Sequence, residues 1–210
     1  VGEVVALRRE LGLPLSGKRF LVPVIEGGST SLAQRIRALG GETDEVTVGR
    51  IVKIEGALTE SDLDGVDRIV ITSRNGWLGL DGRMRMAAEK RGIRIEEVRK
   101  VEAIGRTLHL TQPDADRVEG VRSIDVYRNE EIPLATTIDL SKYDAAFFTC
   151  ASSVRRVCAR SVGSTVALAI GPKTAAALEK FVCRIVVAAE SNLDSLISAA
   201  TTVETSMKGC

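Results

Sequence analysis

Donor groups suited to binding anions follow an apolar run in the last third of the sequence. In DAAFFTCASSVRRV, residues 144–157, the apolar run ends at Thr149, and small or polar residues follow as far as Ser153. A segment of helical character comes next, so these residues and their N–H groups stand at a helix start. Such N–H groups have no partner inside the helix, and the helix dipole favours negative charge there. The segment therefore predicts a site for carboxylates or phosphates, with ordinary helix capping as the simpler alternative.

A second segment of the same kind is AIGPKTAAALEK, residues 169–180. Gly171 permits a tight turn, and Pro172 suits the first helical position because its missing N–H would be unpaired there anyway. Lys173 and Thr174 then fall in the first helical turn, where the Thr174 hydroxyl can add a hydrogen bond to an anion. We predict a second anion site here, again with capping as the alternative.

The composition argues against several other kinds of function. Lysine and arginine number 29 and aspartate and glutamate 28, a formal net charge of +1 that gives no reason to expect nucleic-acid binding. His109 is the only histidine, which argues against a catalytic triad or a His-rich metal site. The four cysteines show no CxxC spacing, so we expect reduced thiols in a cytoplasmic protein. No apolar run approaches the roughly 18 residues that a membrane span needs, so no membrane partner is expected.

Strand-like and helical segments alternate along the chain. Helices are expected within 26–41 and over 83–92, 151–162, 172–182 and 192–204, the last capped by Asn192. Buried or alternating strands are expected over 18–25, 43–56, 66–73, 93–105, 122–133, 142–149, 165–171 and 184–190. This order predicts parallel sheets with helices on both faces, which bind ligands at the carboxyl ends of their strands.

Two pairs of segments resemble each other across the chain. VDRIVITSRNG (66–76) is similar to YDAAFFTCASS (143–153), and VEAIGRTL (101–108) is similar to ALAIGPKTA (167–175). Each half thus carries an apolar strand ending in Thr, and then an AIG turn with a Thr shortly after it. The matching order predicts two related α/β halves.

Three motifs of the last third together resemble the uroporphyrinogen-III synthase family. They are YDAAFFTCASSVRR, LAIGPKTAAALEKF and VVAAESNLDSLISA, which occur in the order of the family's final strand, turn-helix and last-helix motifs. VDRIVITSRNG resembles the strand that opens the family's second domain, and SIDVYRNEE resembles the segment that carries its Tyr. KRFLVPV resembles the first strand, although Pro23-Val24 stands where Thr-Arg is usual.

The resemblance implies two flavodoxin-like parallel-sheet domains joined by a two-stranded ribbon. The first domain would comprise residues 17–50 and 137–205, the second residues 58–125, and the ribbon residues 51–57 and 126–136. The family normally has a much longer segment, with strands and a helix, between the motifs that end at Thr107 and begin at Asp125. We therefore expect a shortened second domain, whose half of the substrate cleft is incomplete if the missing segment contributes to it.

The resemblance also implies a reaction and its site. The family dehydrates and cyclises hydroxymethylbilane, a polyanionic linear tetrapyrrole, while inverting its last pyrrole ring, without cofactor or metal. Tyr127 matches the family's Tyr and is the expected proton donor to the leaving hydroxyl; Tyr143 is the alternative that we expect to be structural. The pocket is expected between the domains, with the turns at 150–153 and 171–174 on one wall and the turn at 72–76 on the other. The expected substrate-binding residues are Thr72, Ser73, Arg74, Asn75, Thr107, Thr149, Ala151, Ser152, Ser153, Gly171, Lys173 and Thr174.

Two alternatives to an active synthase stay open at this point. VGEVVALRREL resembles the final segment of uroporphyrinogen-III C-methyltransferase, so residues 1–16 are expected to be a linker from a fused upstream methyltransferase. The chain could then be a synthase-like domain that binds tetrapyrroles and supports its fusion partner without turnover. An unrelated anion-binding module of flavodoxin-like type is the other alternative.

Overall fold

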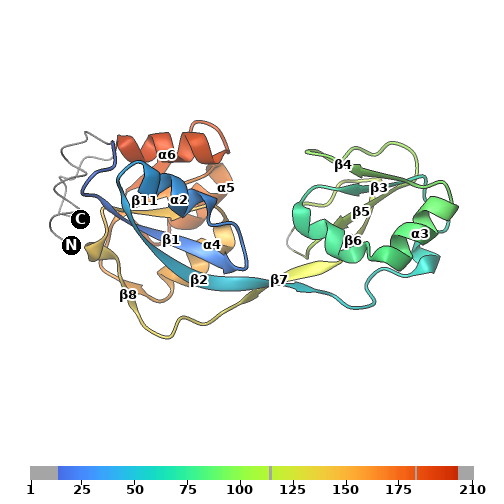
Figure 1. Cartoon of the computed structure of the whole chain (residues 1–210), viewed down its shortest axis with the longest axis horizontal. Helices are drawn as coiled ribbons and strands as arrows, with labels where there is room; N and C mark the ends of the chain where they lie inside the picture. The colour runs from blue at the N-terminus through green and yellow to red at the C-terminus, as the bar shows by residue number, and fades with distance from the viewer. Residues whose placement is uncertain (1–13, 114, 183, 203–210) are drawn as a thin grey trace. The chain divides into compact units, whose positions relative to one another are not determined.

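The computed structural model describes residues 14–113, 115–182 and 184–202 (Figure 1). The chain divides into two compact units, which we call the first and second units. The first unit comprises the chain up to Arg50 and from Glu131 onward, and the second unit is the continuous segment Ile51–Glu130. The second unit is therefore inserted in the sequence of the first.

A six-stranded sheet forms the first unit, in the order β12-β11-β9-β1-β2-β7. Neighbouring strands from β12 to β2 run parallel. In order of the chain these five strands are arranged 2-1-3-4-5, which is the flavodoxin-like order. The strands are β1 (Arg19–Glu26), β2 (Glu42–Lys53), β7 (Tyr127–Glu131), β9 (Ala145–Phe148), β11 (Val166–Ala169) and β12 (Ile185–Val187).

Helices cover both faces of this sheet (Figure 1). The core on one face joins α2 (Ser31–Ala38) and α6 (Leu193–Thr201) to alternate residues of the strands, and it includes Phe20 and Phe147. The core on the other face joins α4 (Ala151–Cys158) and α5 (Pro172–Leu178) to the intervening strand residues. The three-layer arrangement that the alternating pattern predicted is thus confirmed. A small parallel pair, β8 (Ile138–Asp139) and β10 (Ser161–Val162), and the short helix η3 (Leu140–Lys142) complete the unit.

The second unit is built on a four-stranded parallel sheet in the order β4-β3-β5-β6. The strands are β3 (Arg68–Ile71), β4 (Arg94–Glu97), β5 (Thr107–Thr111) and β6 (Arg122–Asp125). They follow the arrangement 2-1-3-4, the same order as in the first unit without its fifth strand. The helices of this unit are η1 (Glu60–Leu63), η2 (Arg74–Gly79) and α3 (Gly82–Lys90).

The two faces of the second sheet differ in chemistry. Ile69, Ile71, Leu108 and Leu110 point to one face, where they share a core with residues of η1, η2 and α3. The alternate residues point to the other face, because side chains along a strand alternate between faces. That face carries the buried polar residues Arg68, Thr107, His109 and Thr111. All the helices described in this unit pack on the apolar face, and the described residues between β5 and β6 contain no helix.

Strands β2 and β7 are neighbours in the first sheet, and each contains one of the two points where the chain passes between units. Backbone hydrogen bonds from Ile54 to Val126 and from Ile132 to Val48 continue the pairing at its two ends. The methyltransferase-like linker was expected over residues 1–16, and residues 1–13 of it lie outside the described residues. Of that segment, Leu15 is described: it is fully buried in the core that contains Phe20.

Most expected elements are present, with corrections in two strand segments. The segment 122–133 is not one strand but two, β6 and β7, which belong to different sheets. The segment 93–105 is a strand only over Arg94–Glu97, and the rest is a loop that leads into β5. At the start of helix α2 the Ser29 hydroxyl accepts from the Ser31 N–H at 3.2 Å. The Asn192 cap is confirmed, because its side-chain oxygen accepts from the Ser195 N–H at 2.8 Å.

We predict that amides in residues 58–125 exchange faster than those in residues 137–205. A domain of about 80 residues keeps much of its surface exposed, and here helices stabilise only one face of the sheet. Hydrogen exchange with mass spectrometry on the whole chain measures both regions at once. Equal or greater protection in residues 58–125 would mean that the shorter unit is a complete and compact variant of the fold.

Candidate functional site

The carboxyl ends of β9 and β11 meet at one edge of the first sheet. Phe148 pairs with Ala169 in register, so the turns that follow the two strands are side by side. Helices α4 and α5 begin from these turns and contact each other. A Cβ on Gly171 would come within 2.7 Å of the Ser191 hydroxyl, so glycine allows the loop before α6 to approach this turn. The segments 149–153 and 171–174, which the sequence singled out separately, therefore form one edge.

Several of the donors at this edge are already used within the protein. The Ser153 hydroxyl donates to the Cys150 carbonyl at 2.7 Å, and the Ser152 hydroxyl lies 3.2 Å from the Cys150 sulfur. The Thr174 N–H donates to the Gly171 carbonyl at 3.1 Å. One N–H group of the first turn of α5 is therefore bonded within the protein, and Pro172 has none to offer. No side chain caps α4 or α5, and Ala151, in the first turn of α4, is half-buried.

Substituting Thr174 tests this edge of the first unit. Thr174 is buried, at 4% exposure, at the start of α5, and we predict that it holds a substrate carboxylate. Thr174→Ala should then lower kcat/KM about 10- to 100-fold, the effect of losing one hydrogen bond to a charged group. Thr165→Ala is the matched control, because the Thr165 hydroxyl donates to the Tyr143 carbonyl away from this edge. Equal kinetics for both variants, with normal stability, would remove Thr174 from the site.

At the second sheet, Thr72 and Ser73 follow β3 and point to opposite faces. The Thr72 hydroxyl lies 3.1 Å from His109 Nε2, on the polar face. The Ser73 hydroxyl lies 2.9 Å from the Tyr127 hydroxyl, and Tyr127 packs with the apolar core. The structure thus joins two residues that were expected separately, Ser73 and Tyr127. Arg74 and Asn75 come next, in the first turn of η2, where Arg74 is exposed and Asn75 half-buried.

Both edges lie where the strand order reverses. In the first sheet the reversal falls between β1 and β9, and in the second between β3 and β5. Open parallel sheets bind ligands at such positions, outside the carboxyl ends of the strands. The segments 72–75 and 149–153 each follow a strand that borders the reversal point of its own sheet. The similarity of these two segments in the sequence therefore corresponds to a similar place in the fold.

The expectation for Thr107 needs a correction. Thr107 does not follow a strand into a helix, as Thr174 does, but begins β5 opposite Arg68, the first residue of β3. It therefore lies at the amino edge of the sheet. Its hydroxyl accepts from Arg68 Nε at 2.9 Å and donates to the Ile104 carbonyl at 2.6 Å, so it anchors a buried arginine.

The sequence reasoning missed His109 as part of this site. His109 is 3% exposed and contacts Thr72, and burial and then the charge of Arg117 lower its pKa, while Asp125 opposes them. The alternation of Thr, His and Thr with Leu at 107–111 was a usable signal, since it indicates a strand with one polar face. Tyr143, the alternative proton donor, instead donates to Asp44 at 2.9 Å near the amino edge of the first sheet.

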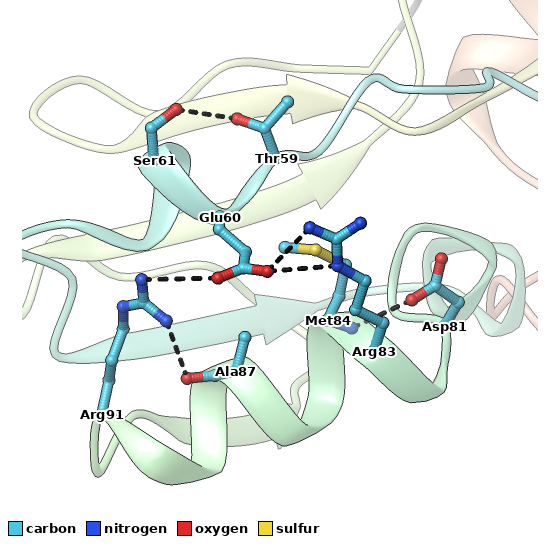
Figure 2. Close-up of polar contacts among 8 residues, drawn as sticks. All are labelled: Thr59, Glu60, Ser61, Asp81, Arg83, Met84, Ala87 and Arg91. Carbon is cyan, nitrogen blue, oxygen red and sulfur yellow. Dashed lines mark hydrogen bonds and ion pairs between the residues drawn. The ribbon is translucent and has the colours of Figure 1, made fainter.

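A pocket of about 290 Å³ lies elsewhere in the second unit. Its walls come from residues 53–60, Gly79, Asp81, Arg83 and Met84, so none of the expected site residues lines it. In Figure 2, Glu60 of the pocket wall accepts from Arg83 at 2.9 Å and pairs with Arg91, and Asp81 caps α3 by accepting from the Met84 N–H. We assign the pocket no role in the proposed site.

Among the described residues, no group of three or more His, Cys, Asp or Glu side chains could hold a metal ion. Cys150 and Cys158 are free thiols, and burial raises the pKa of Cys158 to about 11. The described helices include none with the length and apolar character of a membrane span.

Comparison with known proteins finds a family similarity in the last part of the chain. Residues 117–198 match the model of a family described as uroporphyrinogen-III synthase HemD. The fold is similar to the crystal structure of uroporphyrinogen-III synthetase from Helicobacter pylori 26695, with a TM-score of 0.57 and 14% identity over 89% of this chain and 100% of that one. Residues 117–198 therefore resemble the uroporphyrinogen-III synthase family, and the fold as a whole is similar to that of a synthase. The match covers Tyr127 and the edge of the first unit but not Thr72–Asn75.

Further structural neighbours carry the same family name. A mutant uroporphyrinogen III synthase from the extremely thermophilic bacterium Thermus thermophilus aligns with a TM-score of 0.49 and 17% identity, over 89% of this chain and 98% of that one. The fold assignment rests on the Helicobacter structure, whose score is higher. A search of curated proteins gives no match. The mixed α/β fold predicted from the sequence is therefore confirmed, and the family match supports the synthase function in tetrapyrrole biosynthesis.

Proposed function

We propose that this chain is an active uroporphyrinogen-III synthase, which dehydrates and cyclises hydroxymethylbilane to uroporphyrinogen III with inversion of the last pyrrole ring. The observation that carries the proposal is the family match over residues 117–198, because that segment contains Tyr127 and all of the predicted donor turns of the first unit. The fold supports it with two parallel sheets, each with polar residues at its reversal point.

The chemistry of the substrate fits the residues that the two edges carry. A carboxylate only accepts hydrogen bonds, so a polyanionic tetrapyrrole needs donors: hydroxyls, N–H groups and cations. The first unit offers Thr149, Lys173 and Thr174 at its edge, and the second unit offers Thr72 and Arg74 at its own. The substrate carries many carboxylates, and each of the two sets of donors suits such groups.

The reaction needs little acid–base or nucleophilic catalysis from the protein. The pyrrole nitrogen pushes the hydroxyl from the neighbouring carbon, so the C–O bond breaks readily once a proton reaches the leaving oxygen. The protein mainly holds the chain in the curvature that lets the last ring be attacked in its inverted sense. We propose Tyr127 as the proton donor, with Ser73 as its hydrogen-bond partner; this pair is joined at 2.9 Å.

The isomer of the product tests the proposal. Hydroxymethylbilane closes by itself to uroporphyrinogen I, so the measurement is the ratio of isomer III to isomer I, with and without the protein. An excess of isomer III that scales with protein concentration is the expected result. Isomer I alone, together with saturable binding of uroporphyrinogen III, would favour a tetrapyrrole-binding domain that supports a fused methyltransferase. Binding of inorganic phosphate but of neither tetrapyrrole would favour a general anion-binding module.

A further inference from the structure

His109 lies within a buried polar strip on the helix-free face of the second sheet. It is 3% exposed, and Thr107 and Thr111 on the same strand are similarly buried. The His109 Nε2 atom lies 3.1 Å from the hydroxyl of Thr72, which is exposed at the carboxyl edge. The other ring nitrogen, Nδ1, is buried and has no hydrogen-bond partner among the described residues. A histidine in this position connects the interior of the unit to a hydroxyl at the proposed substrate edge.

The ring is neutral at ordinary pH, so only one of its nitrogens carries a proton. Burial and the charge of Arg117 lower the pKa of His109, and Asp125 offsets only part of this. Arg117 and Asp125 are themselves paired at 2.6 Å, so the carboxylate is engaged. A neutral imidazole has one donor nitrogen and one acceptor nitrogen, and its surroundings decide which is which.

The surroundings favour the proton on Nε2. A proton on Nδ1 would be a buried donor without an acceptor, which is rarer in folded proteins than a buried acceptor without a donor. Ser123 pairs with His109 in register on the adjacent strand β6, and side chains at paired positions point to the same face. The Ser123 hydroxyl is also buried without a partner among the described residues. The two groups are not bonded to each other, so Ser123 does not provide a proton on Nδ1 with an acceptor.

We propose that His109 carries its proton on Nε2 and donates it to the Thr72 hydroxyl oxygen, which directs the Thr72 hydroxyl proton outward to a substrate carboxylate. His109 is then a positioning residue, which acts through Thr72 and does not touch the substrate. This inference rests on the proposed function for its substrate. His109 thus orients the Thr72 hydroxyl as a donor before substrate binds. A carboxylate only accepts hydrogen bonds, so it is the group that such a hydroxyl binds best.

The tautomer of His109 can be observed directly, because it is the only histidine in the chain. Nitrogen-15 NMR of the whole chain, purified without a polyhistidine tag, gives one pair of imidazole nitrogen signals. The expected spectrum at neutral pH has protonated Nε2 and unprotonated Nδ1. A proton on Nδ1, donated for example to Asp125, would overturn the proposal, since Thr72 would then have to donate to the ring.

Kinetics then test whether the hydrogen bond matters for substrate. His109→Leu and Thr72→Val should each raise KM for hydroxymethylbilane about tenfold with little change in kcat, because each removes the same aligned donor. The double variant should be no worse than either single variant. His109→Gln, whose amide can donate near the position of Nε2, and Thr72→Ser should both recover most of the loss. Independent effects that multiply in the double variant would overturn the proposal.

The two proposals can fail separately. If the wild-type chain forms no isomer III, the proposed synthase function fails, and the NMR tautomer alone decides the assignment of His109. If the wild type is active but His109→Leu has normal KM while retaining its fold, the inference fails and the function stands. If His109→Leu does not fold, Thr72→Val and the wild-type tautomer decide: a normal KM in Thr72→Val, or a proton on Nδ1, overturns the inference.

Discussion

Replacing Tyr127 with phenylalanine should lower kcat by up to about 10²-fold, the low end of the range for loss of a general acid. The low end is expected because the pyrrole nitrogen assists departure of the hydroxyl. The ring itself packs in the core of the second unit at 5% exposure, and phenylalanine preserves that packing. Stability should therefore change little, and single-turnover formation of isomer III measures the chemical step.

Two matched variants separate proton donation from a structural role. Ser73→Ala removes the partner at 2.9 Å but leaves the Tyr127 hydroxyl, so it should lower kcat less than Tyr127→Phe. Tyr143→Phe changes the only other tyrosine, which bonds Asp44 away from the proposed site, and should leave kcat unchanged. If Ser73→Ala and Tyr127→Phe reduce kcat equally, the pair acts as a structural hydrogen bond and Tyr127 is not the acid.

Replacing Phe147 with alanine should cost about 3–5 kcal/mol of the free energy of unfolding of the first unit. Phe147 is 1% exposed in the central strand region, and its ring meets Phe20 edge-to-face with centroids 5.3 Å apart. The substitution removes the ring and leaves a cavity beneath α2 and α6. Urea titration followed by far-UV circular dichroism measures the loss.

The chain provides its own controls for this measurement. Phe181 belongs to the same unit but is 46% exposed, so Phe181→Ala should change stability by no more than about 0.5 kcal/mol. Trp77, the only tryptophan, lies in the second unit and reports its unfolding by fluorescence. A fluorescence transition that moves as far as the dichroism transition in Phe147→Ala would show that the two units unfold together. A loss below about 1 kcal/mol would mean that the core around Phe20 closes over the cavity.

The elements of the first unit were predictable because local signals agreed with the fold. The apolar strand at 145–148, the Pro172 helix start and the Asn192 cap each carry a local pattern that tertiary contacts do not overrule. The donor turns after β9 and β11 could be found for the same reason. Which of their N–H groups stay open could not, because the Thr174–Gly171 bond depends on the geometry of one turn.

The second unit was harder to predict because the residues around Thr107, on its polar face, resemble the turn that contains Thr174. The repeat placed Thr107 after a turn, on the model of Thr174, although Leu108, His109 and Leu110 do not continue it as an Ala-rich helix. The alternation of polar and apolar residues over 107–111 decides the outcome in favour of a strand, and pairing with Arg68 buries the Thr107 hydroxyl. The contacts of His109 with Thr72 and of Ser73 with Tyr127 join residues far apart in sequence, which no local pattern encodes.

The insertion of the second unit within the first sets an order of events during synthesis. Strand β1 lies between β2 and β9, but β9 is made only after the whole of the second unit has been translated. On the ribosome, the central strand of the first sheet must therefore wait with one edge unpaired while the inserted unit emerges and folds. Domains usually fold from the N-terminus onward as they are made. Here the second unit can fold before the first unit, because strand β1 still lacks its neighbour β9. If residues 51–130 fold slowly or not at all, the unpaired edge of β1 stays exposed to other nascent chains.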